Sequence, residues 1–304
     1  MPESTQTTVS IVGGSGYVGG ELLRLLLFHP YVTVAQITSA SQVGRYMHTV
    51  HPNLRGVTSL QFLHPDALAP ADVLFLAVRH GEAAIDIEHY AGLADRIIDC
   101  SADFRLHDPA FYAGWYDADH PAPDWLGRFV YGLPERYRAD LSSAYYASGV
   151  GCNATAAILA LAPLADAGLL TQAVVDVKVG SSEAGARHTA SSHHPERSRA
   201  VRSFKPTGHR HQAEVIQALG DSFDLHFSVT AVELVRGVLA TCHCIPNRRI
   251  EEKEIWRLYR AAYSQEPFVR LVKSRAGLHR YPEPKLLAGS NYCDIGFEVD
   301  PDTG

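Results

Sequence analysis

The chain has 304 residues, of which 46% are hydrophobic and 20% are charged, a balance typical of a globular protein with about two domains. Its net charge of −6, from 27 Lys and Arg against 33 Asp and Glu, argues against a general nucleic-acid binder. No apolar run is as long as a membrane span, and the first residues lack the basic and apolar regions of a signal peptide, so a cytoplasmic protein is expected.

The first predicted strand, 9–12, leads into a glycine-rich turn and then into a predicted helix at 21–26. The turn fits G-x-G-x-x-G from Gly14 and equally G-x-x-G-x-x-G from Gly13. Glycines let the backbone approach a pyrophosphate closely, and a helix N-terminus offers it free N–H groups. A dinucleotide is therefore expected here rather than a turn that binds nothing. Its expected contacts are Gly13, Gly14, Ser15, Gly16, Tyr17 and Val18.

The second predicted strand, 32–38, indicates which dinucleotide is bound. An NAD site places Asp or Glu about twenty residues after the last glycine, where it binds the ribose 2′-hydroxyl. This chain has hydroxyl groups and a cation there instead, which suit a 2′-phosphate and favour NADP(H). The residues concerned are Thr38, Ser39, Ala40, Ser41 and Arg45.

Two further apolar strands, 73–78 and 96–100, predict a parallel, doubly wound sheet of the Rossmann type. Ligands of such sheets lie beyond the carboxyl ends of the strands, where His80, Ser101 and Arg105 are found. The alternatives, a loop histidine and a surface ion pair, stay open at this stage.

Cys152 follows the glycine turn 149–151 and precedes a predicted helix at 156–161. A helix N-terminus favours a thiolate, and its N–H groups can hold an oxyanion, so a nucleophile is expected rather than a small core residue. The other cysteines lie in or beside strand-like segments and are expected to be core thiols: Cys100, Cys242, Cys244 and Cys293. No metal site is expected, because Cys242-His243-Cys244 has no second ligand pair with zinc spacing.

The stretch 181–211 is rich in Gly, Ser and His and has little hydrophobic period, which predicts a long loop. It is also basic, which suggests an anionic substrate or partner, although a solvated flexible loop is the alternative.

Four motifs follow one another, at 13–22, 101–105, 151–155 and 208–211. With them the chain resembles the N-acetyl-gamma-glutamyl-phosphate reductase family, relatives of aspartate-semialdehyde dehydrogenase. It looks most like the branch that reduces carrier-protein-bound L-2-aminoadipate 6-phosphate in lysine biosynthesis. The motifs of that branch lie at 51–56, 193–198, 205–211, 266–273 and 279–282.

The resemblance implies an enzyme that reduces an acyl phosphate with NADPH through a Cys thioester. Cys152 would attack the acyl carbon and release phosphate, and a histidine would deprotonate the thiol and later protonate the oxyanion. His211, with Glu214 one helical turn further on, is favoured over His209. The expected substrate-binding residues are Arg105, Ser101, Asn153, Arg187 and Lys205.

The expected fold is a Rossmann-type NADP-binding domain over 1–150, followed by an α+β catalytic and oligomerisation domain of the aspartate-semialdehyde-dehydrogenase type over 151–290. The central strands of the second domain are expected around 174–179, 228–235 and 238–244. A homo-oligomer, dimer or tetramer, is implied by the resemblance. Residues 291–304 would begin a return segment, with a strand at 295–300 and a turn at 301–304. The resemblance implies that this segment continues beyond residue 304, so the sequence is expected to be truncated.

The resemblance also implies an acidic amino-group carrier protein as partner, docked on the cations of 187–210, with Arg270, Lys273 and Arg280 as further candidates. Glutamate 5-phosphate is a second possible substrate. Two alternatives stay open: the N-acetylated-substrate reductase of arginine biosynthesis, and a nucleotide-binding protein without catalysis.

Overall fold

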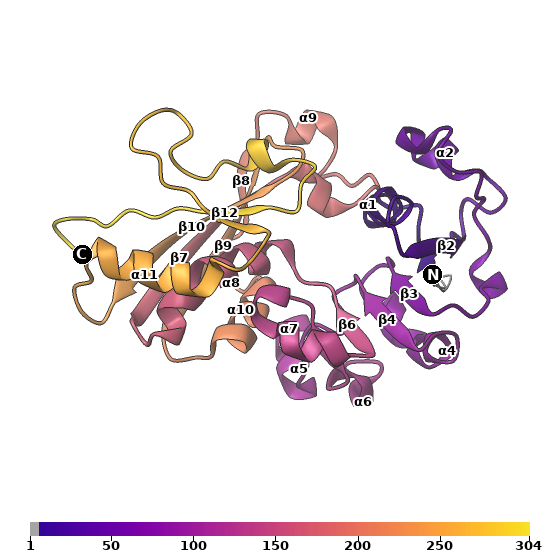
Figure 1. Cartoon of the computed structure of the whole chain (residues 1–304), viewed down its shortest axis with the longest axis horizontal. Helices are drawn as coiled ribbons and strands as arrows, with labels where there is room; N and C mark the ends of the chain where they lie inside the picture. Colours follow the sequence, from indigo (N-terminus) through magenta and orange to yellow (C-terminus); the bar gives the residue numbers. More distant parts are fainter. Residues whose placement is uncertain (1–5) are drawn as a thin grey trace, which may run out of the picture. The chain divides into compact units, whose positions relative to one another are not determined.

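The computed structural model describes residues 6–304, and the chain divides between Val150 and Gly151 into two compact units (Figure 1). Each unit has its own sheet, and each is described by itself. Within residues 6–304, no helix combines the length and the apolar composition that crossing a membrane requires.

The first unit is built on a six-stranded sheet in the order β2-β1-β3-β4-β6-β5, and every neighbouring pair is parallel. This confirms the predicted Rossmann-type parallel sheet. Its strands are β1 (Thr7–Val12), β2 (Val32–Ile37), β3 (Val73–Leu76), β4 (Arg96–Asp99), β5 (Phe129–Tyr131) and β6 (Tyr146–Ser148). Its helices are α1 (Tyr17–Leu26), α2 (Met47–Val50), α3 (Glu82–Ile85), α4 (Ile87–Ala91), α5 (Pro109–Tyr116), α6 (Pro123–Leu126) and α7 (Pro134–Ser143), with 3₁₀ turns η1 (Pro52–Leu54) and η2 (Pro65–Ala67).

The packing of α1 on the sheet explains the glycines at its start. Leu23 of α1 is buried with Ile11 of β1 and Ile37 of β2 in the core of this unit. A Cβ on Gly19 would lie 2.5 Å from the Cα of Gly14, so the helix can approach the loop only if residue 19 has no side chain.

The second unit has a mixed four-stranded sheet in the order β10-β7-β9-β8, in which only β7 and β9 are parallel. Its strands are β7 (Leu170–Val179), β8 (Val201–Lys205), β9 (Asp224–Val232) and β10 (Val238–Pro246), with a separate parallel pair, β11 (Val269–Leu271) and β12 (Cys293–Ile295). Its helices are α8 (Cys152–Asp166), α9 (His194–Arg197), α10 (His211–Leu219) and α11 (Glu252–Tyr263), with 3₁₀ turns η3 (Ser181–Ala184) and η4 (Pro284–Leu287).

Helix α8 packs against β7, β10, α10 and α11 and forms the centre of this unit. Two of its alanines, Ala154 and Ala157, are fully buried and allow these close approaches. Along β7 the side chains alternate: Val175 and Val177 are buried, whereas Val174 on the opposite face is 37% exposed.

Two expectations for the second unit are wrong. The stretch 181–211 is not a single loop, because it contains α9 and the edge strand β8, which pairs antiparallel with β9. The expected strand 295–300 is also absent from the described structure, where the paired strand β12 ends at Ile295. Phe297 instead packs its ring against Trp256 and Tyr259, so side-chain contacts rather than a ladder of hydrogen bonds hold this segment.

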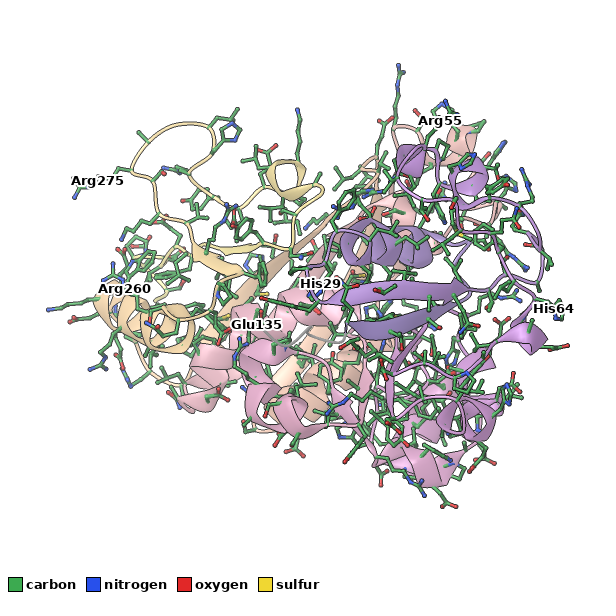
Figure 2. The ribbon with its side chains drawn as sticks, turned by 45° about the vertical axis from the view of Figure 1, so that its right-hand side comes forward. His29, Arg55, His64, Glu135, Arg260 and Arg275 are labelled. Carbon is green, nitrogen blue, oxygen red and sulfur yellow. The ribbon has the colours of Figure 1, made fainter. Side chains whose placement is uncertain are left out.

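Charged side chains are distributed over the surfaces of both units. The labelled side chains of Arg55, Arg260 and Arg275 extend outward from the ribbon (Figure 2), and all three residues are exposed. None of the five cysteines forms a disulfide within residues 6–304.

Two glycine substitutions should act in opposite directions. Gly19→Ala should lower the free energy of unfolding by about 1–3 kcal/mol, because its Cβ meets the Gly14 backbone. Gly114→Ala, in the exposed interior of α5 with nothing near its Cβ, should raise it by about 0.5–1 kcal/mol. Urea unfolding measures both values, and an unchanged midpoint for Gly19→Ala would contradict the packing described.

Candidate active site

Cys152 is the first residue of α8, and Gly151 caps the helix with an extended backbone, at φ −71° and ψ 132°. The Cys152 residue is exposed, and its thiol donates to Oδ1 of the fully buried Asn153 at 3.5 Å. The free N–H groups and the dipole of the helix N-terminus stabilise negative charge at this point. The thiol is therefore accessible and placed where a thiolate or an oxyanion is favoured.

Helix α10 brings two further groups to the residue before the thiol. Glu214 is fully buried, and its Oε2 accepts the Gly151 N–H at 2.9 Å. His211, also buried, has its Nε2 at 3.8 Å from Glu214 Oε1. A Cβ on Gly151 would lie 2.6 Å from Glu214 Oε1 and 2.8 Å from His211 Nε2. Residue 151 must therefore be glycine for the imidazole and the carboxylate to reach the start of α8.

His209 lies beside this group. Its ring packs edge-on against His211 at 4.6 Å and stacks on Phe227, and its Nδ1 accepts the His211 N–H at 3.1 Å. Burial, and then the nearby His211 and Arg210, lower the pKa of His209 to about 3. The ring is consequently neutral at physiological pH and a weak base.

Two of the three cations expected at the substrate, Lys205 and Arg187, lie on exposed parts of the second unit. Lys205 is at the end of β8, where its charge contributes to the lowered pKa of His209. Arg187 is exposed, and no hydrogen bond or ion pair within residues 6–304 joins it to Cys152. The structure thus brings Lys205, and not Arg187, to the histidine pair.

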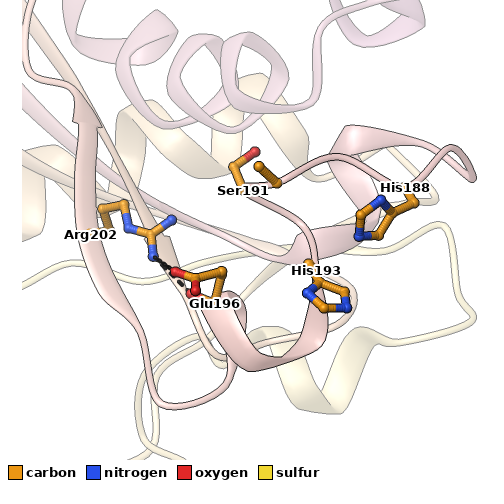
Figure 3. Close-up of a pocket in the computed structure, with 6 residues that line it drawn as sticks. His188, Ser191, His193, Glu196 and Arg202 are labelled. Atoms are coloured by element: carbon orange, nitrogen blue, oxygen red, sulfur yellow. Dashed lines mark hydrogen bonds and ion pairs between the residues drawn. The ribbon is translucent and has the colours of Figure 1, made fainter.

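A pocket of about 570 Å³ lies in the segment between β7 and α10 (Figure 3). The lining residues are His188, Ala190, Ser191, His193, Glu196 and Arg202. The imidazole rings of His188 and His193 meet edge to face, with 4.7 Å between their centroids. The Arg202 guanidinium lies 3.9 Å from the Glu196 carboxylate. Neither Cys152 nor His211 lines this pocket, so it is distinct from the thiol group.

In the first unit, the glycine loop is shaped for close approach of a ligand to the backbone. Gly13 has φ +77°, and a Cβ there would lie 2.6 Å from the Ala77 carbonyl oxygen. A Cβ on Gly14 would collide with Ile37. Gly16 caps α1 with an extended backbone, and Tyr17 and Val18 are exposed on the first turn of that helix. The loop therefore fits the diphosphate of a dinucleotide at a helix N-terminus.

Hydroxyl groups gather at the end of β2, next to this loop. Ser39 Oγ donates to Ser15 Oγ at 2.9 Å and lies 3.5 Å from Ser41 Oγ. The Oγ1 of the fully buried Thr38 has no partner among the described residues. Ala40 and Arg45 are exposed, and the Arg45 guanidinium donates to Gln42. These hydroxyls and the nearby cation fit a ribose phosphate better than a ribose hydroxyl.

Ser101 and Arg105 are buried at the carboxyl end of β4. The Ser101 hydroxyl donates to Asp99 Oδ2 at 2.8 Å and accepts the Asp103 N–H at 3.0 Å. The Arg105 Nε donates to the carbonyl oxygens of Ser101 and Gly149 at 3.0 and 2.9 Å. Both residues therefore hold the ends of β4 and β6 together, in addition to any contact with substrate.

Sequence reasoning named His80 but missed its partner. The His80 Nδ1 lies 2.6 Å from Oδ1 of the fully buried Asp103, which also accepts the N–H groups of Gly81 and Ala84. The hydrogen bonds from His80 and from these two amides hold the pKa of Asp103 below its usual value, against the opposing effect of burial. The only local signal was an aspartate after a buried strand, which does not identify a partner 23 residues earlier.

Comparisons with known proteins show what this chain is similar to. The model "Semialdehyde dehydrogenase, NAD binding domain" matches residues 8–144, and "Semialdehyde dehydrogenase, dimerisation domain" matches 152–304. A Thermomicrobium roseum protein provisionally named LysW-L-2-aminoadipate 6-phosphate reductase is 56% identical to this chain, over 96% of this chain and 85% of the length of that protein. The LysW-L-2-aminoadipate 6-phosphate reductase of Deinococcus radiodurans is 48% identical, over 98% of this chain and 86% of the length of that protein.

Among solved structures, aspartate semialdehyde dehydrogenase II of Vibrio cholerae superposes with a TM-score of 0.70 at 14% identity, over 96% of this chain and 88% of that one. At this identity the likeness concerns the fold alone.

Asp99 should make the stability of the protein depend on pH. Burial raises its pKa from 3.8 to about 6, against the hydrogen bonds from Ser101. The folded state therefore binds this proton more tightly, and the stability gained from it is lost as pH rises from about 4 to about 6. The Asp99→Asn variant has no proton to release at this position, so its stability does not fall in this way. The stability of the variant relative to wild type should rise by up to about 3 kcal/mol over that range and stay level above it.

Urea unfolding at several pH values measures this difference, and the other titrating groups cancel because both proteins contain them. A difference that is the same at pH 4 and pH 7 would show that Asp99 is not perturbed in the folded state.

Proposed function

The chain belongs to the semialdehyde dehydrogenase family, and from this premise we propose that it is an NADPH-dependent reductase of a carrier-protein-bound L-2-aminoadipate 6-phosphate. The product would be the semialdehyde, with release of phosphate, in lysine biosynthesis. The observation that carries the proposal is the accessible Cys152 thiol at the N-terminus of α8, with His211 and Glu214 against the residue before it.

The first step uses the Cys152 thiolate. Its sulfur attacks the acyl carbon of the substrate, the bond from that carbon to the phosphate oxygen breaks, and phosphate leaves with the electron pair. A thioester remains on Cys152. The N–H groups at the start of α8 stabilise the oxyanion that forms on the way, since they point toward the end of the helix where the thiol lies.

The second step reduces this thioester. Bound NADPH supplies a hydride for the carbonyl carbon. The resulting hemithioacetal then releases the semialdehyde and regenerates the Cys152 thiolate. Splitting the reaction in this way lets phosphate depart before the carbon is reduced.

His211 is proposed as the acid–base residue. Its Nε2 is within 2.8 Å of the Cβ position of residue 151, next to the thiol, and Glu214 lies 3.8 Å away to stabilise a protonated ring. His209 is the weaker candidate because its pKa of about 3 keeps it neutral, and its Nδ1 already accepts the His211 N–H.

NADP(H) is proposed as the nucleotide. The glycine loop would hold the diphosphate, while the Ser15, Ser39 and Ser41 hydroxyls and Arg45 would bind the 2′-phosphate. In substrate binding, Arg105 and Ser101 would act at the strand ends of the first unit, and Asn153 and Lys205 in the second unit. Arg187, also expected at the substrate, is exposed and is assigned to carrier docking instead.

An acidic carrier protein is proposed to dock on exposed cations of the second unit. Arg197 and Arg202 are less available, because Arg197 donates to the Val179 carbonyl at 2.6 Å and Arg202 donates to the Glu196 carbonyl at 2.8 Å. Arg187 and Arg199 are exposed, and no such contact is found for either within residues 6–304. These two arginines are the better candidates for attracting the carrier.

A homo-oligomer through the second sheet is proposed as well. On the face of β7 opposite α8, Val174 lies beside His243 of β10, and Asp176 beside Thr241. Their exposed or half-buried side chains form a mixed polar and apolar surface, which a second copy could cover by two-fold symmetry. The name of the matching model, a dimerisation domain, supports this proposal.

The chemistry is tested by running the reaction backward with NADP, phosphate and the carrier-linked semialdehyde. Cys152→Ser should lower the rate by at least about 10³-fold, because an alcohol is a far weaker nucleophile. Cys293→Ser, at a half-buried thiol of β12, should retain the wild-type rate. The absorbance of the NADPH formed is the measurement, and an unchanged rate for Cys152→Ser would reject the nucleophile.

The same assay distinguishes the two alternative functions. If only N-acetylglutamate semialdehyde is turned over, the protein is the reductase of arginine biosynthesis. If the protein binds NADPH but turns over neither semialdehyde, it is a nucleotide-binding protein without catalysis.

The carrier surface is tested by the double variant Arg187→Ala/Arg199→Ala. Removing two exposed cations should raise KM for the carrier-bound substrate by about tenfold and leave kcat unchanged, since only encounter and docking are weakened. Arg260→Ala, an exposed arginine of α11 (Figure 2), is the matched control. If a small acyl phosphate suffers the same loss, these arginines act on the substrate itself and the docking proposal is wrong.

A further inference from the structure

A histidine outside the predicted site contacts the glycine loop of the first unit. His51 follows α2, and its Nε2 lies 2.8 Å from the Gly14 carbonyl oxygen. A carbonyl oxygen can only accept, so the imidazole donates this hydrogen bond. The ring is half-buried and leans against Phe62 at 6.5 Å.

The ring reaches the loop because Gly20 of α1 leaves room for it. A Cβ on residue 20 would lie 2.7 Å from both Cε1 and Nδ1 of His51. Glycine in the middle of a helix is unfavourable, by about 0.5–1 kcal/mol relative to alanine. The close contact with His51 gives a reason for a glycine at this position.

Gly14 is held on both of its backbone groups. Its N–H donates to the Thr38 carbonyl at 2.9 Å, and its carbonyl accepts from His51. In a trans peptide the carbonyl and the next N–H point in opposite directions. Because the Gly14 carbonyl points to His51, the Ser15 N–H points away from His51, to the other side of the loop.

We propose that His51 is a positioning residue that keeps the Gly14–Ser15 peptide in the orientation that binds the diphosphate of the nucleotide. A glycine on one side of a peptide offers little resistance to its rotation. Without the imidazole, the peptide could flip and direct a carbonyl oxygen, instead of an N–H, at the negatively charged diphosphate. The inference rests on the proposed role of this loop in binding NADP(H).

The test measures Kd by fluorescence titration with two ligands, NADPH and adenosine 2′-phosphate, which lacks the diphosphate. His51→Ala should weaken NADPH about 10- to 100-fold, the range of one lost hydrogen bond to a charged group. Adenosine 2′-phosphate should change by less than about twofold, because its phosphate meets the serine hydroxyls instead. His51→Gln, whose amide can still donate, should recover part of the affinity.

Gly20→Ala is a second and independent variant. It keeps the imidazole but displaces it, and alanine should favour the helix itself. It should therefore weaken NADPH as His51→Ala does without lowering the melting temperature. His48→Ala is the matched control and should bind NADPH like wild type. His48 is a half-buried histidine of α2, the helix that His51 follows, and its ring stacks on Tyr46.

Three results would overturn the inference. If His51→Ala binds NADPH with the Kd of wild type, His51 does not position the peptide and the inference is wrong. Equal weakening of both ligands in His51→Ala and Gly20→Ala means that His51 supports the unit as a whole and not one peptide. A wild-type protein that binds no NADPH rejects the proposed function, and with it the inference.

Discussion

The buried carboxylate of Glu214 links the two helices that form the candidate site of the second unit, α8 and α10. Glu214 has no exposed surface, and a carboxylate in that position would be strongly destabilising without partners. Its main-chain partner is the Gly151 N–H, at the positive end of the α8 dipole. This one hydrogen bond joins the starts of α8 and α10, so the place of Cys152 and the approach of His211 to the preceding residue follow from the same constraint. The absent side chain of Gly151 makes the contact possible.

In the first unit, backbone groups form the candidate binding surface, and neighbouring elements hold them in place. In the loop after β1, missing side chains let backbone meet backbone, as where Gly19 faces Gly14, and leave peptide groups open to a ligand. The orientation of those peptides then has to be set from outside the loop. Thr38 holds the Gly14 N–H and His51 holds its carbonyl, so the binding surface is a set of peptide planes fixed by neighbouring elements.

The proposed chemistry divides between these two arrangements. In the proposal, the second unit provides the thiol, the His211 imidazole as acid–base group and a helix N-terminus, which would form and hold a thioester on Cys152. The first unit would provide the nucleotide site, with hydroxyls suited to a 2′-phosphate. The proposed acidic carrier would require exposed positive charge. Arg187 and Arg199 are exposed, and within residues 6–304 no hydrogen bond or ion pair to either guanidinium group is found.

The sequence by itself determined the parallel sheet, the glycine loop and the place of Cys152 at a helix start, because apolar runs, glycine spacing and helix composition are local signals. Only the tertiary structure decided which distant groups meet: Gly151 with Glu214, 63 residues apart, and Gly14 with His51, 37 apart. It also made β8 a strand, since pairing with β9 orders an exposed segment whose side chains do not alternate between apolar and polar. The lowered pKa of His209 likewise depends on its packed neighbours and not on the identity of the residue.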